Sequence, residues 1–574
     1  MLRYLLILLL FISLVISSPS KTSRSIRKIT LHIKPASINP DCFTESFAAV
    51  LINDQFPAPA IHVVKGDLID VTVKNDPSHN ASTSIHFHGI KQLYTNYADG
   101  VPGVTQLPIL PGQEYTQRFK VDDQSGTYFY HAHVSTQDDT IQGPFIIYES
   151  EETLEKKACD GPYSYDEEFT LQWSHWWHQS LQDREAYYLG SNFAGDSGPD
   201  SVLLNGKGVY PNVTLSQDQN CKGFTYFDVE PNKVYRLRNI GAVTFRMLEI
   251  SIKDHDMKLI EIDGEYVKPF GLKSIEIDAG QRMSVLIRTG NHKPGSLFPI
   301  LSQFKWRNDA NNPGYTQSGY GYLRYINPKH KAKEALRILS KPKTPPYNAT
   351  NVPGWVLSQV KPYKSCPSEI LDAKPDHTFY INMREVILPD NRTRFINNNR
   401  PYMENPWESA TTSLLDMVKK DHDVHILEKD GYDPKHHTYP VGQNKIIDLV
   451  FQNHFLPSPA PPGLCVSHPW HTHGYSHYLL AEGAGDYDPK SDKDVVTFSE
   501  PLFKDVSIVY PRISEGSIGC GWTKVRIFTD NPGVWAIHCH ITAHMLQGKI
   551  IVLEVAPEKI KSKKSSNSRQ TRAS

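Results

Sequence analysis

Residues 533–544 read GVWAIHCHITAH, a stretch that begins with strand-forming residues and continues into three histidines and one cysteine. In a strand, residues i and i+2 point to one face of the sheet, and residue i+1 points to the other. On the predicted strand Gly533–Ile541, His538 and His540 therefore face one side, and Cys539 faces the opposite side. The pattern predicts two different ligand sites on the two faces of one strand.

Similar strand-like runs, separated by Gly, Pro, Asn and Asp, recur along the chain. In Leu68–Asn75, apolar and polar residues alternate with the period of two that is typical of a half-buried strand. We expect further strands at Gly126–Val134, Val234–Asn239, Lys258–Asp263, Arg282–Arg288 and Lys549–Val555. Helical periodicity is confined to short pieces near Thr411–Lys420. Many short strands with turn signals predict an all-β protein built of β-sandwich domains.

Length and composition bound the number of domains and the class of protein. A chain of 574 residues corresponds to roughly three or four domains of ordinary size. Hydrophobic residues make up 39% of the chain and aromatic residues 11%, which is enough to bury substantial cores. The 61 Lys and Arg residues balance 62 Asp and Glu residues, and this balance argues against a nucleic-acid-binding protein.

Composition shifts indicate where the domains end. A charged stretch at 149–161 follows a predicted strand, and a Lys/Pro-rich segment lies at 341–346. We expect domains at residues 28–150, 160–335 and 365–557, followed at 558–574 by a basic, disordered and solvated tail, with a tether to a cell wall or a polyanion as the alternative.

The N-terminal residues predict export. Arg3 precedes the mostly apolar run Tyr4–Ile16, which is shorter than the about 20 residues that a membrane span needs. We interpret residues 1–17 as a signal peptide cleaved after Ser17, with an uncleaved anchor as the alternative. No second apolar run of spanning length is present, so we expect a secreted protein without a membrane span. Export would make four N-x-S/T sequons available for glycosylation, at Asn80, Asn212, Asn348 and Asn391.

The chain has seven cysteines: Cys42, Cys159, Cys221, Cys366, Cys465, Cys520 and Cys539. Cys539 stands between two histidines and is set apart as a candidate metal ligand. The other six suffice for three disulfides in an oxidising compartment, and sequence alone leaves their 15 possible pairings open.

Ten of the 25 histidines fall in four compact clusters, each with an H-x-H pair. The clusters are IHFHG (Ile85–Gly89), YHAHV (Tyr130–Val134), HPWHTHG (His468–Gly474) and HCHITAH (His538–His544). One such pair is ordinarily a surface or core feature, but four are hard to assign to chance. Four converging pairs supply eight imidazoles, which exceed the ligands of one metal ion and match a cluster of three. A zinc site, the other chemical possibility, needs only four ligands.

The remaining ligands predict a second site. A thiolate from Cys539 with the imidazoles of His468 and His544 gives the trigonal set of two nitrogens and one sulfur expected of an electron-transfer copper. The covalent path from Cys539 to either flanking histidine is short, so one strand would connect the two sites. A disulfide or an inert thiol at Cys539 would leave those histidines unexplained.

In these four motifs the chain resembles the multicopper oxidase family, which includes laccases, ascorbate oxidases and extracellular ferroxidases. The resemblance implies three cupredoxin-like Greek-key β-sandwich domains, with a copper cluster between the first and the third. It also implies four copper ions. The type 1 copper would take His468, Cys539 and His544, the type 2 copper His86 and His471, and the type 3 pair His88, His131, His133, His473, His538 and His540.

Other stretches resemble the ascorbate oxidase branch: YADGVPG around Asp99, WWHQS at Trp176–Ser180, LLNGKG at Leu203–Gly208 and DGEYVKPF at Asp263–Phe270. The resemblance implies a disulfide between Cys42 and Cys221. It also implies a role for Asp99 in proton delivery near the cluster, with a turn residue before Gly as the alternative. Trp176 and Trp177 are candidates for the substrate approach or for the core.

Two positions depart from the family pattern. The family places Met, Leu or Phe five residues after the last type 1 histidine, where this chain has Lys549. The axial position tunes the potential of the copper, so the pattern does not predict that potential here. Many members carry an acid directly after H-C-H-I, where this chain has Thr542, and we therefore expect Asp99 to carry more of the proton supply.

The resemblance implies a secreted copper oxidase with dioxygen and a small reducing substrate as its partners. A phenol, an aromatic amine or ascorbate would give up single electrons, and dioxygen would be reduced to water. Extracellular oxidation of Fe(II) for iron uptake is one alternative. A secreted copper-binding protein without turnover is another.

Overall fold

The computed structural model describes residues 25–210, 220–305, 318–327, 337–339, 356–400, 411–421, 425–457, 464–512, 514, 516 and 519–560. The predicted signal peptide, the boundary segment at 341–346, the sequons at Asn212 and Asn348 and residues 561–574 of the predicted tail lie outside these ranges. Within the described ranges, no helix combines the length and the apolar character that crossing a bilayer requires.

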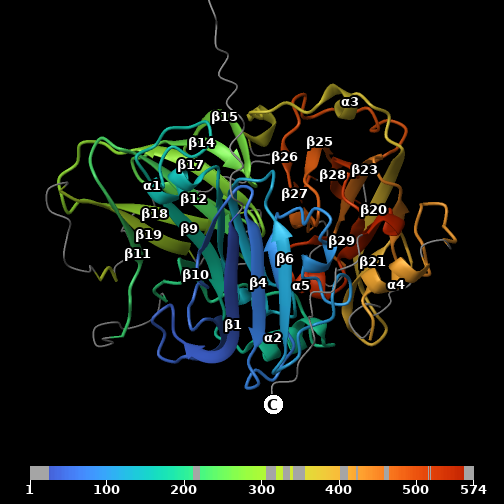
Figure 1. Ribbon diagram of the computed structural model, residues 1–574, viewed down its shortest axis with the longest axis horizontal. Coiled ribbons are helices and arrows are strands. Elements are labelled where there is room, and N and C mark those ends of the chain that lie inside the picture. Colours follow the sequence, from blue (N-terminus) through green and yellow to red (C-terminus); the bar gives the residue numbers. More distant parts are fainter. Residues whose placement is uncertain are drawn as a thin grey trace, which may run out of the picture.

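The described strands form six sheets in three successive pairs, coloured blue to cyan, teal to green, and orange to red in Figure 1. The strands of the first pair are β1 (Ile26–Ile38), β2 (Phe47–Ile52), β3 (Ile61–Val64), β4 (Leu68–Asn75), β5 (Ile85–His88), β6 (Glu114–Lys120), β7 (Gly126–Ala132) and β8 (Gln142–Tyr148). Those of the second pair are β9 (Glu167–Trp176), β10 (Ser201–Leu204), β11 (Thr225–Val229), β12 (Val234–Gly241), β13 (Leu248–Ile252), β14 (Met257–Ile262), β15 (Glu265–Leu272), β16 (Ser274–Ile277), β17 (Arg282–Arg288), β18 (Leu297–Phe304) and β19 (Ser318–Tyr325). Those of the third pair are β20 (His377–Ile387), β21 (Thr393–Asn397), β22 (Tyr439–Val441), β23 (Ile446–His454), β24 (His468–Thr472), β25 (His477–Gly483), β26 (Phe503–Lys504), β27 (Val506–Val509), β28 (Gly519–Phe528), β29 (Gly533–Cys539) and β30 (Ile550–Val555).

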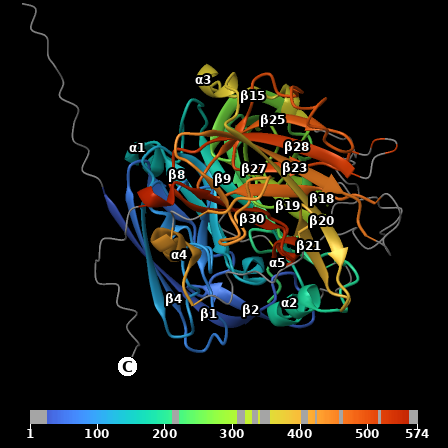
Figure 2. The same cartoon turned by 90° about the vertical axis from the view of Figure 1, so that its right-hand side faces the viewer.

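Helices are short and lie between or beside the sheets (Figure 2). They are α1 (Glu151–Lys156), α2 (Leu181–Leu189), α3 (Ser368–Leu371), α4 (Leu414–Asp421) and α5 (Thr542–Leu546), with 3-10 turns that include η1 (Asn96–Ala98) and η2 (Gln137–Asp139).

Each sheet pair repeats one strand topology. In the first sheet of each pair, β1 lies between β2 and β4, β9 between β10 and β12, and β20 between β21 and β23. In the second sheet of each pair, β3, β11 and β22 run parallel to β8, β19 and β30. This pairing of non-consecutive strands in two packed sheets confirms the predicted all-β fold of three cupredoxin-like Greek-key sandwiches. Strands β5 and β7 of the first pair are thus equivalent to β24 and β29 of the third. The exact domain limits stay predictions.

The predicted strands are present with small differences in their ends. β4 and β17 have the predicted bounds, and a helix, α4, begins where helical periodicity was expected. The predicted strand Gly533–Ile541 is too long, because β29 ends at Cys539. The chain then turns into α5, which brings His544 back toward Cys539. A straight strand would have carried His544 away from it.

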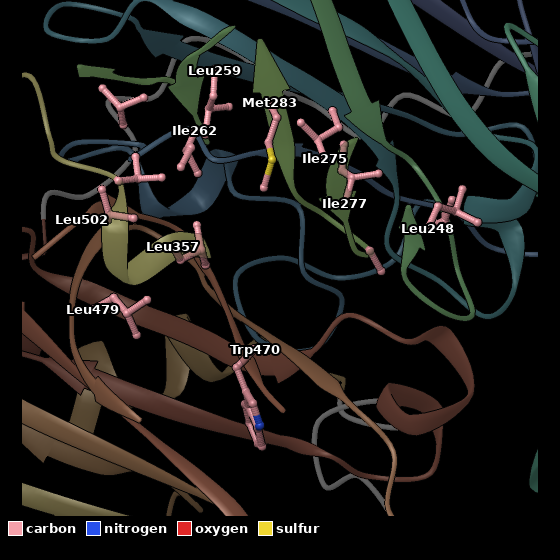
Figure 3. Packing of buried hydrophobic residues seen from close by; sticks show 14 of the residues in the cluster. Leu248, Leu259, Ile262, Ile275, Ile277, Met283, Leu357, Trp470, Leu479 and Leu502 are labelled. Atoms are coloured by element: carbon pink, nitrogen blue, oxygen red, sulfur yellow. The ribbon is translucent and has the colours of Figure 1, made fainter. Parts of the chain in front are cut away.

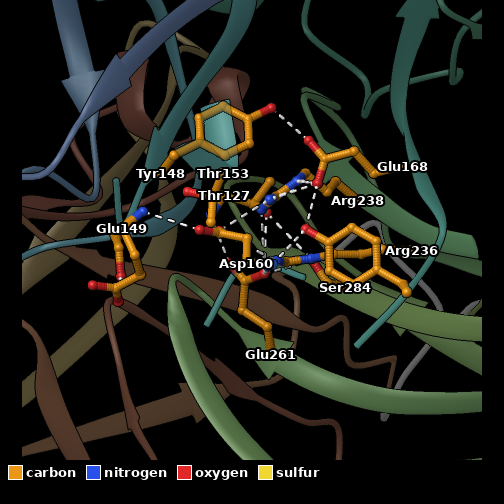
Figure 4. A network of polar contacts seen from close by, with 12 residues as sticks. Thr127, Tyr148, Glu149, Thr153, Asp160, Glu168, Arg236, Arg238, Glu261 and Ser284 are labelled. Carbon is orange, nitrogen blue, oxygen red and sulfur yellow. Dashed lines mark hydrogen bonds and ion pairs between the residues drawn. The ribbon is translucent and has the colours of Figure 1, made fainter. Parts of the chain in front are cut away.

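Two kinds of contact hold the sheet pairs together. A continuous apolar core joins the second and third pairs, and Met283 of β17 and Trp470 of β24 both belong to it (Figure 3). A buried polar network joins the first and second pairs (Figure 4). There the Thr127 amide of β7 donates to Glu261 Oε1 at 2.6 Å, and Arg238 donates to Thr127 Oγ1 at 3.0 Å. Because these groups are buried and paired, they fix the position of β7, the strand that carries His131.

The structure forms two disulfides. The Cys42–Cys221 bond confirms the pairing implied by the family resemblance, and the second bond joins Cys465 to Cys520. The expected third disulfide is absent, because Cys159 and Cys366 are free thiols. Each of these thiols contacts a backbone carbonyl close to it in sequence instead of another cysteine.

Candidate metal centres

Eight imidazoles from the first and third sheet pairs converge in one place, which we call the histidine cluster: His86, His88, His131, His133, His471, His473, His538 and His540. Rings from the two ends of the chain interleave. The ring centroids of His86 and His473 lie 4.0 Å apart, and those of His88 and His471 lie 3.8 Å apart. The structure therefore brings together all four H-x-H pairs that the sequence singled out.

Strand register explains why the histidines meet. His86 of β5 lies directly opposite His131 of β7, and His471 of β24 lies directly opposite His538 of β29. Cross-strand partners point to the same face of a sheet, so each pair of strands presents its imidazoles together. The two strand pairs are topologically equivalent, and their histidine faces turn toward each other.

The opposite face of β24 and β29 carries a separate set of ligands. Trp470 is the cross-strand partner of Cys539, so both point away from the histidine cluster. His468, two residues before Trp470, shares that face. His471 follows Trp470 and His538 precedes Cys539. Both histidines therefore point to the other face, toward the cluster. The alternation of a single strand thus separates two centres, as the sequence predicts.

Backbone carbonyls fix the orientation of several imidazoles in the cluster. His86 Nδ1 lies 2.7 Å from the carbonyl oxygen of Asp99, and His471 Nδ1 lies 3.0 Å from that of Asp505. His131 Nδ1 lies 2.8 Å from the carbonyl of the next residue. A carbonyl can only accept, so these Nδ1 atoms carry the proton and leave the Nε2 lone pair free.

The free nitrogens fit metal ions. The Nε2 atoms of His86, His131 and His471 are buried and have no hydrogen-bond partner among the described residues. His473 Nε2 lies 3.0 Å from His538 Nε2, a distance at which two lone pairs repel unless a cation lies near them. Three triplets within the cluster have ligand atoms within 4.8 Å of one another, including His133, His473 and His538. Unpaired buried nitrogens facing one another are the donor set that a metal would satisfy.

Burial keeps the imidazoles uncharged. Loss of hydration holds the pKa of His88, His131, His133, His473 and His540 well below the ordinary value. The same effect lowers the pKa of His538 to about 3. Neutral imidazole is the form that binds metal ions, so the cluster is ready to coordinate at neutral pH.

Asp99 is buried against the cluster. It follows η1, and its Oδ2 lies 2.9 Å from His473 Nδ1. Its carbonyl also orients His86, so a single residue contacts one histidine from each end of the chain. Asp99 also ends the turn before Gly100, and its role in proton delivery stays a prediction.

Asp505 is a second carboxylate beside the cluster, and like Asp99 it contacts one histidine through its side chain and another through its carbonyl. It was not among the residues predicted from the sequence. Asp505 Oδ1 lies 3.2 Å from His88 Nε2, and its carbonyl orients His471. Arg282 of β17 donates from Nη1 and Nη2 to the two carboxylate oxygens of Asp505, at 2.6 Å each. This bidentate ion pair keeps the carboxylate charged in a buried place. No sequence spacing links Asp505 to a histidine motif.

The second candidate centre, which we call the cysteine site, consists of His468, Cys539 and His544. Cys539 Sγ lies 3.7 Å from His468 Nδ1 and 3.5 Å from His544 Nδ1, and the two nitrogens are 3.2 Å apart. All three side chains are buried. Two nitrogens and one sulfur at the corners of a small triangle match a trigonal copper centre.

The thiol of Cys539 needs a cation to ionise. Burial raises the pKa of Cys539 to about 12, so without a metal the sulfur stays protonated at neutral pH. A metal ion that binds there has to displace this proton.

Lys549, the departure at the axial position, is buried beside the cysteine site. Its amide donates to the His544 carbonyl at 2.9 Å, and its carbonyl accepts from the Cys539 amide at 3.0 Å. Its ammonium lies 4.5 Å from the centre of the Phe395 ring. Burial lowers the pKa of Lys549 to about 8, against an attraction to Cys539. Lys549 therefore places an ionisable side chain at the axial position, where the family pattern has Met, Leu or Phe.

Thr542, the second departure, has a carboxylate partner from another element. Its hydroxyl donates to Asp138 Oδ2 of η2 at 2.6 Å. Burial raises the pKa of Asp138 to about 6, against the hydrogen bond from Thr542 and the charge of Arg184. The acid missing from the H-C-H-I motif is therefore replaced by one that follows His133 by five residues. The sequence analysis missed Asp138 as well.

Trp176 and Trp177 belong to the core. Both are buried, and Trp176 packs with Phe47 and Phe56. The Arg184 guanidinium lies 3.7 Å from the centre of the Trp177 ring. These contacts are those of core aromatic residues, and a role in the substrate approach stays a prediction.

Known proteins similar to this chain include oxidases of plants and fungi. L-ascorbate oxidase of Nicotiana tabacum is 29% identical over 93% of this chain and 91% of its own length. Laccase-like multicopper oxidase 1 of Thermothelomyces thermophilus is 27% identical over 90% of this chain and 85% of its own length. The crystal structure of Fet3p, a multicopper oxidase that functions in iron import, is 24% identical and covers 94% of this chain and 93% of its own with a TM-score of 0.75. At this identity the last match shows the fold alone.

Family models described as multicopper oxidase match residues 32–152, 167–328 and 404–559, which together span most of the chain. The second of these matches covers the middle sheet pair, which supplies no residue to the histidine cluster or the cysteine site. The protein thus belongs to the multicopper oxidase family, whose members bind copper, and it is a copper-dependent oxidoreductase that uses dioxygen.

Proposed function

We propose that this protein is a secreted four-copper oxidase that couples the one-electron oxidation of ascorbate, a phenol or an aromatic amine to the four-electron reduction of dioxygen to water. The observation that carries the proposal is the adjacency of the two centres, because His538, Cys539 and His540 are consecutive and face alternately into the histidine cluster and the cysteine site. The relatives named L-ascorbate oxidase and laccase support this substrate class.

The proposed ligand set assigns every residue of the two centres. The type 1 copper takes His468, Cys539 and His544; the type 2 copper takes His86 and His471; and the type 3 pair takes His88, His131, His133, His473, His538 and His540. When bound, copper supplies one-electron transfer and dioxygen chemistry, which no amino-acid side chain provides by itself.

The protein's own residues orient ligands and hold protons. Asp99 Oδ2 accepts from His473 Nδ1, while Asp99 Oδ1 is buried, lies 3.4 Å from His86 Nδ1 and has no hydrogen-bond partner among the described residues. Asp505 is tied to Arg282 and serves only to orient His88 and His471. Asp99 and Asp138 are therefore the proposed proton carriers, and Asp505 is a positioning residue.

Small molecules have separate approaches to the two centres. A cavity of about 200 Å³ reaches His133 and is lined largely by apolar side chains, including Val101, Val134, Leu546 and Ile550. Its size and polarity suit the entry of dioxygen and the exit of water. In the cysteine site, His544 is 7% exposed and His468 is 3% exposed, so the edge of His544 is the proposed contact for the electron donor.

Turnover with three donors tests the proposal. We expect copper-loaded protein to show the blue absorption of a copper thiolate and to consume dioxygen with ascorbate or a phenolic dye. The value of kcat/KM for at least one of these donors should exceed that for Fe(II) by about tenfold or more. A preference for Fe(II) over both donors would replace this proposal with the ferroxidase alternative.

Secretion has its own test. We expect protein recovered from the medium of a eukaryotic host to begin at Ser18, because the proposed cleavage follows Ser17. Protein that stays in the cell with Met1 at its N-terminus would contradict export.

A further inference from the structure

Four metal-binding side chains meet outside the two copper centres. His425, Asp433 and His436 belong to the segment between α4 and β22, and Glu554 belongs to β30. One ligand atom from each of the four side chains lies within 4.8 Å of the other three. We call this group the outer cluster. None of its residues belongs to the histidine cluster or the cysteine site.

The contacts within the outer cluster are short and converge on its carboxylates. Asp433 Oδ2 lies 2.9 Å from His425 Nδ1 and 3.0 Å from His436 Nδ1. Glu554 Oε1 lies 3.4 Å from His425 Nε2. In a tetrahedral zinc site with bonds of about 2.0–2.2 Å, neighbouring ligand atoms lie roughly 3.3 Å apart, which is close to the distance between Asp433 Oδ2 and His436 Nδ1. His425 would bind the ion through one of its two nitrogens and keep the other for a carboxylate.

The surroundings position both carboxylates. The Lys435 amide donates to Asp433 Oδ1 at 2.9 Å, and the Thr438 hydroxyl donates to Glu554 Oε2 at 2.7 Å. Each carboxylate thus has one oxygen held by a neighbour and the other directed at the imidazoles. Support of this kind around the ligands is typical of metal sites.

The charge balance of the outer cluster calls for a cation. Asp433 and Glu554 are both 0% exposed, and no Lys or Arg of the described residues forms an ion pair with either. Glu554 Oε1 is buried and has no hydrogen-bond partner among the described residues. The ionisable partners of these carboxylates are His425 and His436, and burial raises the pKa of Glu554. A divalent cation bound among the four side chains would offset the charge of both carboxylates.

We propose that the outer cluster is a structural zinc site. Two imidazoles and two carboxylates form a four-ligand set of nitrogen and oxygen that suits Zn²⁺. Calcium takes six to eight oxygen ligands, and a blue copper centre needs a thiolate, so both fit this set less well. Three ligands from one segment and one from a distant strand would let the ion fasten residues 425–436 onto β30.

The position of the outer cluster makes its role structural. Glu554 pairs across the sheet with Val534 of β29, five residues before Cys539. At about 3.4 Å per residue, Val534 lies roughly 17 Å along the strand from Cys539. The zinc would hold an edge of the sheet that carries the copper ligands, without taking part in electron transfer.

Metal analysis of the copper-saturated protein tests the proposal. Wild type, His436→Asn and Asp433→Asn are loaded with copper, incubated with ZnSO4, passed through gel filtration and analysed for both metals. We expect about one zinc per wild-type chain and at least a fivefold lower zinc content in both variants, at an unchanged copper content. Copper content and blue absorption in the same samples show that the variants are folded.

The neighbouring histidine provides the matched control. His437 has a left-handed backbone with a φ of 60°, which Asn tolerates, and its Nδ1 contacts the Tyr432 hydroxyl rather than the outer cluster. His437→Asn should therefore keep the zinc of the wild type. Wild-type protein that retains no zinc would overturn the proposal. Equal zinc contents in wild type and both outer-cluster variants would overturn it as well.

Discussion

Burial sets the charge of individual residues in both copper centres. It raises the pKa of Cys539 to about 12 and lowers that of His538 to about 3, so that without metal the protein holds a thiol and neutral imidazoles. Cys539 therefore has to lose its proton when copper binds at the cysteine site. Copper uptake at the cysteine site is therefore expected to weaken as the pH falls, because protons compete for the sulfur.

Replacement of the thiol separates the two centres. In Cys539→Ser, the hydroxyl is a poor copper ligand, so we expect loss of the blue absorption and of about one copper per chain. Dioxygen consumption with a phenol should fall by at least about 100-fold, because the donor no longer has an electron acceptor at the cysteine site. Cys366→Ser, which removes a free thiol outside both centres, should leave both measurements unchanged. A Cys539→Ser protein with normal turnover would refute the assignment.

Lys549 should make the potential of the cysteine site depend on pH. Its pKa is near 8, so the ammonium is charged below this pH and neutral above it. A positive charge favours reduced copper, which carries less charge itself. The reduction potential should therefore fall as the pH rises through about 8, by at most about 59 mV per pH unit. Redox titrations of wild type and Lys549→Met between pH 6 and 9 measure this slope. If Lys549→Met had the same pH dependence of the reduction potential as the wild type, Lys549 would not be its cause.

At the scale of elements, short connections supply what the strands lack. β29 ends at Cys539, and α5 returns His544 to the cysteine site and Thr542 to Asp138. η1 leads into Asp99, and η2 contains Asp138. Most of the candidate ligands therefore lie on or next to strands, α5 supplies His544, and the turns place the carboxylates proposed to carry protons.

The pairing of η2 with α5 predicts a proton-supply defect. Because burial raises the pKa of Asp138 to about 6, this acid is protonated below that pH and can donate. In Asp138→Asn, turnover at pH 5 should fall by roughly 10–100-fold. Wild-type turnover should decline above pH 6, where Asp138 loses its proton, and Asp138→Asn should not show this decline. The pH profile of kcat measures both effects, and the exposed substitution Asp122→Asn serves as control. An unchanged profile in Asp138→Asn would exclude this role.

At the scale of the whole molecule, the middle sheet pair supports copper centres to which it contributes no ligand. Arg282 of β17 holds Asp505 and also donates to the Thr127 carbonyl of β7, so it touches both of the other sheet pairs. Gly280, in the turn before β17, packs against His88 and His540. The second sandwich thus closes the histidine cluster from the side.

Gly280 tests this packing. A methyl group there would lie 2.8 Å from His88 Cε1 and 3.0 Å from His540 Cδ2. Gly280→Ala should displace these rings and lower the copper content of the histidine cluster, with a drop in turnover of about tenfold or more. Gly295→Ala is the matched control, because its φ of 87° resembles the 83° of Gly280, while nothing lies within 4 Å of the added methyl group. Both substitutions strain the backbone by about 1–2 kcal/mol, and the Tm of each variant reports this strain. A lower copper content in Gly280→Ala alone would report the contact with the histidines. Equal copper contents would show that Gly280 does not shape the cluster.

The sequence by itself determined the all-β fold and the division of the candidate ligands between two strand faces. Each of these follows from strand alternation, which is local, so H-x-H pairs and the His-Cys-His triplet could be interpreted without a structure. The four histidine clusters lie only in the first and last thirds of the chain, because β13 and β18 keep the topology of the ligand-bearing strands without their histidines. The threefold repeat is a property of strand pairing and not of residue identity.

Only the tertiary structure decided what surrounds the ligands. Asp505 lies 417 residues from His88 in the chain, and Asp138 lies 404 residues from Thr542, so no spacing could have revealed either contact. The outer cluster likewise needs Glu554 from a strand far from its other three residues. Most of the candidate copper ligands alternate along strands, and sequence periodicity records that alternation. Side chains that orient those ligands or carry protons can come from any element that packs nearby, and packing is a property of the folded chain alone.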